Sequence, residues 1–566
     1  MTALLSLVLL FTFIAGCSGP ATPGQKTEGR PAGPKAITIS LEGEFNALAT
    51  ELDSSGVSGL STYAHDFIHN YLTVHGDNDE VAAQLAAQLP SLDDGTWKLL
   101  PDGGMEVTWK LRHGVPWHDG TEFTSADVKF GWEVTVDPAA PLAVPGEAAA
   151  RIYAMETPDP YTVVTHWRDP SRWAREFGRN VTNLLPRHLL EADFQANKAA
   201  FAQHPFFTST DVVIGTGPFR PVEWARGSHL TVQAFDQYWA GKPKLDRVTF
   251  RFIKDNNTVM ANLLAGQLDV ANRGLNWDAV QLLRRDWVPQ GKGELQVQPT
   301  NFRHNLFQFR PEVASPSDLT NPNVRRALIY GVNHEELVEG VFPGAGGHTV
   351  ADSIGYPGTP IGDALEAAIV KYPYDARKAS QLLEDAGWRR GDDGILVKNG
   401  ERFRLDMQAG GDTEDDKTFL LMEPNYKAIG VELVYSSFGG RRQTPEDTAK
   451  FPGLQKTGLP YNQPTFGRRW DGRQIAAPEN RYTGGNRSAY TSPAVDQALD
   501  SIDRSIRFDE ELRWWADAWH HITNDAAVMG LFFVPNPIAQ RTGMHGAFAT
   551  NPSGTATWRA YTWDID

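Results

Sequence analysis

Hydrophobic and polar positions follow two periods along this chain, and the two periods together predict a mixed α/β protein. Val107–Leu111 alternates with a period of two and is rich in β-formers, so it predicts a half-buried strand. Thr124 and Asp127 have the spacing of a capping box and predict the start of a helix. Val128 and Trp132 give that helix one apolar face.

The same periods recur along the rest of the chain. The clearest helix is predicted at Tyr374–Trp388, where Asp375 is expected to cap the first turn and Gly387 to end the helix. Its buried stripe is expected to contain Ala379, Leu382, Leu383 and Ala386. Further strands are predicted at Lys35–Leu41, Tyr161–Trp167, Leu245–Ile253, Leu306–Phe309, Phe403–Gln408, Gly430–Ser436 and Val528–Val534.

The N-terminus begins with an apolar run at residues 4–16, which has the length of the hydrophobic region of a signal peptide. It is shorter than the ~20 residues that span a membrane. The run ends at Cys17, the only cysteine in the chain, so no intramolecular disulfide is possible. Residues 14–17, Ile-Ala-Gly-Cys, resemble a lipobox, which implies that Cys17 carries a lipid. Residues 17–35 then predict a flexible tether rich in Gly and Pro.

Length and charge limit the possible functions. The 566 residues exceed the size of one hydrophobic core, so two or three domains are expected. The chain has 53 basic and 69 acidic residues, a net charge of −16. This balance argues against a nucleic-acid partner, which requires a basic surface.

Residues 111–130 read L-R-x-G-V-x-W-H-D-G-T-x-F-T-x-A-D-V-x-F. This stretch closely resembles the signature of the family 5 extracytoplasmic solute-binding proteins, which are the peptide, nickel and oligosaccharide receptors of ABC importers. Further blocks resemble the family in the family's order, at Ile214–Trp239, Thr258–Ala271, Asn321–Val341, Tyr374–Trp388 and Thr491–Asp500.

The resemblance implies an α/β, two-lobed periplasmic-binding-protein fold with an extra small domain and a ligand cleft between the lobes. The expected boundaries are residues 36–70, 212–297 and 528–566 for the first lobe, 71–211 for the small domain and 298–527 for the second lobe. The implied function is that of a substrate-binding lipoprotein of an ABC importer. The expected partners are a small ligand, the permease subunits and the membrane, reached through Cys17 from outside the cytoplasm. The chain is expected to be a monomer.

Two regions supply candidate ligand contacts. In the family, the loop after the first strand commonly faces the cleft, so Phe45 and Asn46 are candidates. Peptide-binding members often carry an acidic residue in a G-W-x-A-D-Y-x-x-P stretch, where it pairs with the ligand's α-amino group. The corresponding residues here, 458–466, read GLPYNQPTF: Tyr461 and Asn462 fit the pattern, but the acidic residue is missing.

The residues that follow offer different chemistry. Phe466 is a further cleft candidate, and Arg468 and Arg469 can hold a carboxylate through bidentate hydrogen bonds. Trp470 can stack on a ring or an apolar group of a ligand. The alternatives are a solvated surface for the two arginines and a core position for Trp470.

Catalysis and metal binding are not favoured. The sequence has no G-x-S-x-G elbow and no H-E-x-x-H motif, and the one cysteine is assigned to lipidation. His188 is expected to be structural, and His520 and His521 are helix neighbours that point about 100° apart. No enzyme activity, cofactor or metal is therefore expected. A peptide or peptide-like ligand is favoured, with an oligosaccharide, an opine, a metal chelate or a receptor role without transport as alternatives.

Overall fold

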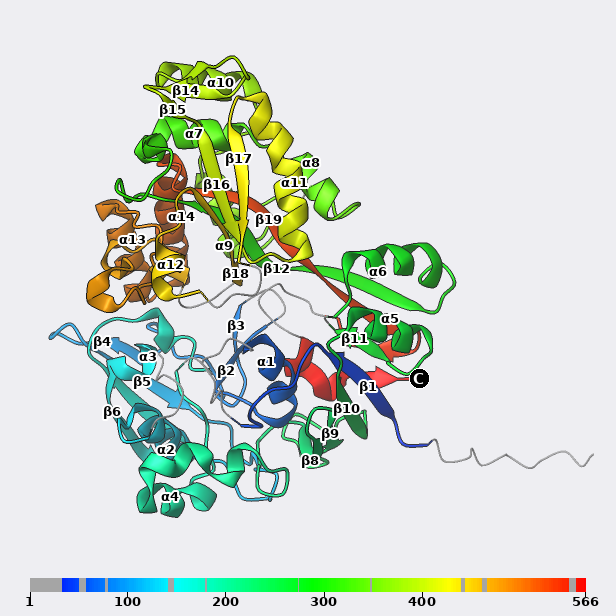
Figure 1. Cartoon of the computed structure of the whole chain (residues 1–566). Helices are drawn as coiled ribbons and strands as arrows, with labels where there is room; N and C mark the ends of the chain where they lie inside the picture. Colours follow the sequence, from blue (N-terminus) through cyan, green and yellow to red (C-terminus); the bar gives the residue numbers. More distant parts are fainter. Residues whose placement is uncertain are drawn as a thin grey trace, which may run out of the picture.

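The computed structural model describes residues 33–49, 58–76, 80–140, 147–178, 181–272, 274–346, 349–438, 443–460, 466–548 and 556–566. The chain forms two lobes and a small domain (Figure 1). Among the sequence-predicted residues, Cys17, Tyr461 and Asn462 lie outside the described residues. No helix in the described part of the chain is long and apolar enough to cross a membrane.

One ten-stranded sheet extends through both lobes, in the order β17-β16-β18-β12-β19-β11-β1-β10-β9-β8. Its strands are β1 (Ala36–Leu41), β8 (Phe219–Ala225), β9 (His229–Ala234), β10 (Arg247–Phe252), β11 (Val270–Asn272), β12 (Gly293–Phe307), β16 (Arg404–Ala409), β17 (Glu432–Ser437), β18 (Leu454–Pro460) and β19 (Val528–Arg541). We call the half from β11 to β8 the first lobe and the half from β17 to β18 the second lobe.

Strands β12 and β19 connect the lobes as one long antiparallel pair, whose register runs from Gly293↔Arg541 to Leu306↔Val528. The register is irregular between Pro299 and Phe302, where Pro299 lies opposite Pro535. The expectation for residues 528–566 places all of β19 in the first lobe. Instead, the first half of the strand packs in the hydrophobic clusters of the second lobe, with Val528, Met529, Leu531, Phe532 and Phe533.

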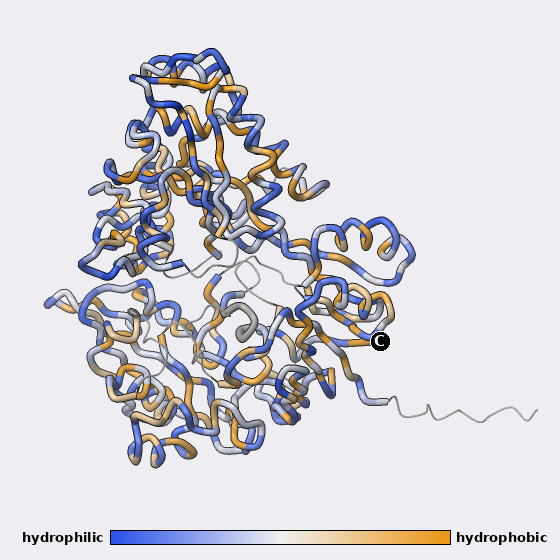
Figure 2. Tube along the Cα trace, in the orientation of Figure 1, coloured by the Kyte–Doolittle hydropathy of each residue, from blue (hydrophilic) through white to orange (hydrophobic). Residues whose placement is uncertain are grey.

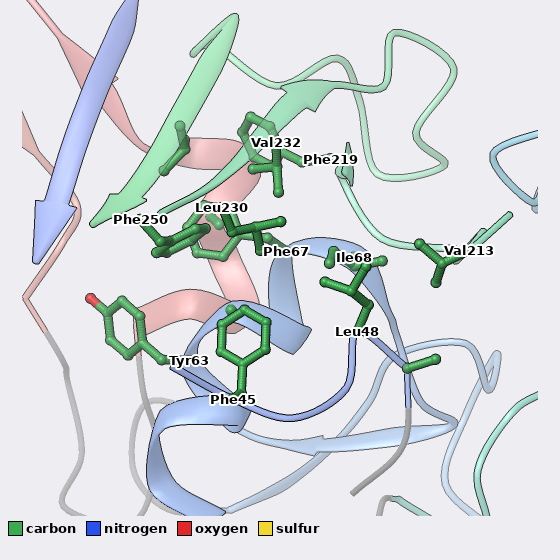
Figure 3. Close-up of a cluster of buried hydrophobic side chains, with 14 of the residues drawn as sticks. Phe45, Leu48, Tyr63, Phe67, Ile68, Val213, Phe219, Leu230, Val232 and Phe250 are labelled. Atoms are coloured by element: carbon green, nitrogen blue, oxygen red, sulfur yellow. The ribbon is translucent and has the colours of Figure 1, made fainter. Parts of the chain in front are cut away.

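The first lobe packs its strands against helices and the C-terminal segment. The elements are α1 (Ser58–Ile68), α5 (Asn256–Leu264), α6 (Trp277–Leu282), η4 (Leu283–Trp287), β20 (Met544–His545), η10 (Ala556–Thr562) and β21 (Asp564–Ile565). Figure 3 shows Phe67 of α1 beside Phe250 of β10, and their ring centroids are 5.0 Å apart. Trp563 joins this aromatic group from the C-terminus, 5.4 Å from Phe67.

The small domain is built on a four-stranded sheet in the order β4-β5-β7-β6. Its elements are β2 (Thr73–His75), β3 (Val81–Ala83), β4 (Trp97–Leu99), β5 (Met105–Lys110), α2 (Ser125–Val136), α3 (Glu147–Arg151), β6 (Ile152–Asp159), β7 (Thr162–Trp167), η1 (Arg172–Ala174), α4 (Arg187–Ala196), η2 (Lys198–Gln203) and η3 (Pro205–Phe207). The predicted strand at Val107–Leu111 is part of β5. The expected capping box is confirmed, because the Asp127 carboxylate accepts a 2.8 Å hydrogen bond from the Thr124 amide.

Two of the sequence blocks meet inside the molecule. The Gly215 amide donates to Nδ1 of His118 at 3.1 Å, so Nε2 carries the proton and donates to the Gly217 carbonyl at 3.0 Å. A Cβ at Gly215 would lie 1.8 Å from the Ile68 carbonyl oxygen, so only glycine permits this approach. The small domain is thereby joined to the end of α1.

The second lobe covers both faces of its sheet with helices. They are η5 (Ser317–Thr320), α7 (Pro322–Tyr330), α8 (His334–Val341), α9 (Pro360–Ala368), α10 (Ala376–Asp385), α11 (Thr413–Ala428), α12 (Pro445–Ala449), α13 (Pro493–Arg504) and α14 (Phe508–Asn524). A small sheet of β13 (Arg389–Arg390), β14 (Leu396–Lys398) and β15 (Glu401–Arg402) follows α10. The predicted cap is confirmed: Asp375 accepts hydrogen bonds from the first amides of α10. Figure 2 shows hydrophilic positions along the outer turns of both lobes, with hydrophobic positions between them.

A buried group of ion pairs connects the small domain to the second lobe. Glu511, at the start of α14, has a side chain only 2% exposed. It accepts a 3.0 Å hydrogen bond from Arg172 and a second, very short one from Arg175. Arg172 also lies 3.7 Å from Asp503 on α13, and Arg151 lies 3.5 Å from the same carboxylate. In this contact, the arginines of the small domain therefore pair with carboxylates of the second lobe.

The first prediction concerns His118. Burial lowers the pKa of His118 from 6.5 to about 3, so below pH 6.5 the unfolded chain binds a proton that the folded chain does not. Stability from this residue is present at neutral pH and is lost as the pH falls from 6.5 toward 3, by up to about 1.4 kcal/mol per pH unit. We expect the wild type and His118→Gln to converge in free energy of unfolding over this range, measured by urea unfolding. A constant difference between pH 7 and pH 4.5 would contradict the assignment.

The second prediction concerns the ion pairs. Glu511→Ala leaves the buried Arg172 and the half-buried Arg175 without that carboxylate, and the expected loss is about 3–5 kcal/mol in free energy of unfolding. Asp509→Ala is the matched control, because Asp509 belongs to an exposed pair with Arg507 on the same helix turn and should change stability little. Equal effects of the two substitutions on the urea midpoint would show that the buried pairs do not stabilise the contact.

Candidate functional site

The carboxyl ends of three parallel strands in the second lobe lie at the edge that faces the first lobe. Strand β16 pairs in parallel with both β17 and β18. The last residue of β18, Pro460, pairs with Asn301 of β12, close to the irregular register at Pro299. Ligands of open α/β sheets bind outside the carboxyl ends of the strands. We call this edge, between the lobes, the strand-end edge.

The segment that follows β18 returns to this region through short helices. They are η7 (Phe466–Arg469), η8 (Gly472–Gln474) and η9 (Pro478–Asn480). Two backbone hydrogen bonds tie the segment to residues further along the chain: the Asn486 amide donates to the Gln474 carbonyl, and the Ala476 amide donates to the Asn486 carbonyl, each at 2.9 Å. These bonds bring Arg487 close to η7.

The buried side chain of Asn486 fixes this arrangement. Its Nδ2 donates to the carbonyls of Asp471 at 3.1 Å and Tyr490 at 2.7 Å. A Cβ at Gly485 would lie 2.8 Å from the Cβ of Arg468, so the two segments touch closely. Asn486 and Tyr490 are 0% and 3% exposed, so both are packing residues.

Arg469 and Arg487 are half-buried cations. Nη1 of Arg469 lies 3.3 Å from Oγ1 of Thr457 on β18. Burial, together with the positive charge of Arg487, lowers the pKa of Arg469 to about 9. Burial also lowers the pKa of Arg487. Arg468, which precedes Arg469 on η7, is half-buried as well.

Within the described residues, no carboxylate forms an ion pair with Arg469 or Arg487. Residues 448–470 contain no Asp or Glu at all. The neighbouring Arg473 differs, because it lies 2.8 Å from Asp471 and 2.7 Å from Asp500. The edge thus carries positive charge that no described carboxylate neutralises.

Trp470 and Phe45 are core residues, which corrects their expected ligand contacts. Trp470 is 0% exposed and packs 5.3 Å from Trp519. Phe45 is 2% exposed, its ring centroid lies 5.3 Å from that of Trp224, and Figure 3 shows its side chain in the core of the first lobe. A side chain without exposed surface has none to offer a ligand. Asn46, the residue after Phe45, is exposed, and its role stays a prediction.

The described residues contain no group of three or more His, Cys, Asp or Glu side chains that could hold a metal ion. His188 is 2.7 Å from Asp119, which is the structural role expected for it. Nδ1 of His520 is 2.9 Å from the Ala368 carbonyl oxygen.

Sequence reasoning missed Arg487 as a functional candidate. It missed the residue because the relevant signal is spatial: Arg487 lies 18 positions after Arg469 and approaches it only through the bonds at Asn486. The charge pattern held a signal for this edge, since Arg468 and Arg469 stand near the end of the acid-free stretch 448–470.

The two lobes, the crossing strands and the small domain define the two-lobed periplasmic-binding-protein fold. A family model for bacterial extracellular solute-binding proteins, family 5 (Middle), matches residues 89–451, and the chain belongs to this family. This finding confirms the resemblance read from the sequence blocks.

Individual relatives and structures agree with the family. The oligopeptide-binding protein AppA of Bacillus subtilis is 26% identical over 457 residues, which cover 75% of this chain and 74% of the relative. The structure of AppA from Bacillus subtilis in complex with a nonapeptide has a TM-score of 0.66 at 20% identity and covers 94% of this chain and 100% of that one. NikA from Brucella suis in complex with Fe(III)-EDTA has a TM-score of 0.74 at 17% identity, with coverage of 94% and 100%. At these identities the two structures show the shared fold.

Proposed function

We propose that this protein is the substrate-binding component of an ABC importer and that its ligand is a peptide or a peptide-like molecule. The observation that carries the proposal is the family match over residues 89–451. The oligopeptide-binding relative, which this chain matches over 75% of its length, supports a peptide as the ligand. In this proposal the ligand binds at the strand-end edge, between the lobes.

The connections between the parts suit a protein that closes on its ligand. Strands β12 and β19 join the lobes, and Pro299 opposite Pro535 lacks the two amides that would complete the ladder there. Interrupted pairing makes bending easier at this point, which fits hinge closure. The ion pairs at Glu511 would hold the small domain against the second lobe when the lobes are closed. A closed form presents both lobes to a permease at once.

The remaining parts of the proposal concern location. We infer that the protein acts outside the cytoplasm as a monomer and that lipidated Cys17 attaches it to the membrane near its permease. Residues 18–35 would then act as the tether between the lipid and β1. We also infer that the ligand is bound and released without chemical change.

The third prediction tests the ligand class. We expect pools of short synthetic peptides to raise the melting temperature of the purified full chain, because a ligand that binds only the folded state stabilises it by about 2.7 kcal/mol at 100 times its dissociation constant. Oligosaccharides and Fe(III)-EDTA serve as parallel probes in the same thermal-shift assay. A shift with either of these and none with peptides would contradict the peptide proposal.

The same samples test binding against catalysis. Peptide recovered from the complex after long incubation should have an unchanged mass by mass spectrometry. Fragments that appear only in the presence of the protein would show hydrolysis and overturn the assignment as a binding protein.

A further inference from the structure

Arg469 and Arg487 differ from the other buried arginines of the second lobe in how their N–H groups are used. A guanidinium has five N–H donors, and burial is costly unless they are paired. Arg325 donates to the carbonyls of Leu319, Asp525 and Ala526. Arg310 is bonded just as fully, with Gln308, Ala449, Ala476 and Arg487 as its acceptors.

The pair at the strand-end edge has almost none of these partners. In the described part of the chain, the Arg469 guanidinium has one hydrogen bond, at 3.3 Å to Thr457, and the Arg487 guanidinium has none. The positive charge of Arg487 also disfavours the charged form of Arg469, and burial disfavours the charged form of Arg487. Two half-buried cations without an acidic partner among the described residues are unfavourable unless an anion joins them.

The described residues around the pair offer no anion and fix the backbone beside the arginines. His304 is 0% exposed, and its burial together with the charge of Arg469 keeps the pKa of His304 well below 6.5, so this histidine is neutral at physiological pH. Nε2 of His304 has no hydrogen-bond partner among the described residues. Asn486 fixes the chain beside Arg487 through its two buried hydrogen bonds. The site is therefore preorganised on bonded backbone.

We propose that Arg469 and Arg487 form a binding site for a carboxylate group of the ligand. Planar guanidinium groups match a carboxylate geometrically, and two of them can bind both of its oxygens. The proposal deepens the proposed function and rests on it for the position of the ligand at the strand-end edge. The carboxylate can belong to the C-terminus of a peptide or to an acidic side chain, and the recognition chemistry is the same.

The fourth prediction uses Arg469→Gln and Arg487→Gln, with Arg377→Gln as the matched control. Arg377 is exposed on α10, at the far tip of the second lobe, so its replacement removes the same charge at a remote place (Figure 1). The probes are one pool of pentapeptides with free C-termini, the same pool with C-terminal amides, and an amidated pool without Asp and Glu. Dissociation constants are measured by isothermal titration calorimetry.

We expect either site variant to bind the free-acid pool about 10–100-fold more weakly than the wild type, and the control to match the wild type. Weak binding of the whole amidated pool assigns the carboxylate to the peptide C-terminus. Weak binding only of the amidated pool without acids assigns it to a side chain. Equal affinity of the wild type and both site variants for the free-acid pool would overturn the carboxylate site and leave the peptide function standing.

A separate probe covers the case in which no peptide binds the wild type, which would sink the peptide proposal. Sodium acetate is then compared with sodium chloride at equal ionic strength in the thermal-shift assay. The carboxylate site predicts a larger acetate-specific rise in melting temperature for the wild type and Arg377→Gln than for Arg469→Gln. The same rise in all three proteins would overturn the site.

Discussion

The antiparallel pairing of β12 with β19 is the constraint on which the rest of the structure depends. These strands lie between the two halves of the ten-stranded sheet, so each lobe is completed by strands that also belong to the other. Their outer ends pack in different hydrophobic clusters, with Leu295 and Ala539 in the first lobe and Leu306 and Val528 in the second. The register is irregular between Pro299 and Phe302 and again between Arg303 and His304, so the ladder that joins the lobes is interrupted in this part.

The most recognisable sequence blocks build the contact between the small domain and the first lobe. Residues 117–120 and 214–218 are conspicuous because a neutral, buried His118 must meet glycine backbone at close range. Such a contact tolerates few substitutions, since a Cβ at Gly215 or at Gly217 would collide with the Ile68 backbone. A motif of this kind identifies the family through its architecture and carries no information about the ligand.

Local signals in the sequence were sufficient to predict individual helices and strands. They were insufficient to predict contacts between segments that are far apart in the sequence. The caps at Thr124 and Asp375 depend on neighbours within three residues, and the structure has both. Strand β12 is far longer than the predicted Leu306–Phe309, because its middle is polar and contains Pro299, which resembles a loop when viewed alone. The ion pair of Arg172 with Glu511 joins residues 339 positions apart, and no periodic pattern encodes it. Trp470 was open to a ligand or a core role, and only the packing of α14 against it decides for the core.

Two charge clusters, one at Glu511 and one at Arg469 and Arg487, both affect the closure of the lobes. At Glu511 the charges are paired within the chain, so this contact is favourable whenever the small domain and the second lobe meet. At Arg469 and Arg487 the charges are unpaired within the described chain, so drying this edge is unfavourable unless an anion is present. In a protein without ligand, closure would therefore be favoured at Glu511 and opposed at Arg469 and Arg487. A bound carboxylate removes the opposition, and its charge interactions strengthen as water leaves the interface. The same two arginines would thus select an anionic ligand and couple its capture to closure of the lobes.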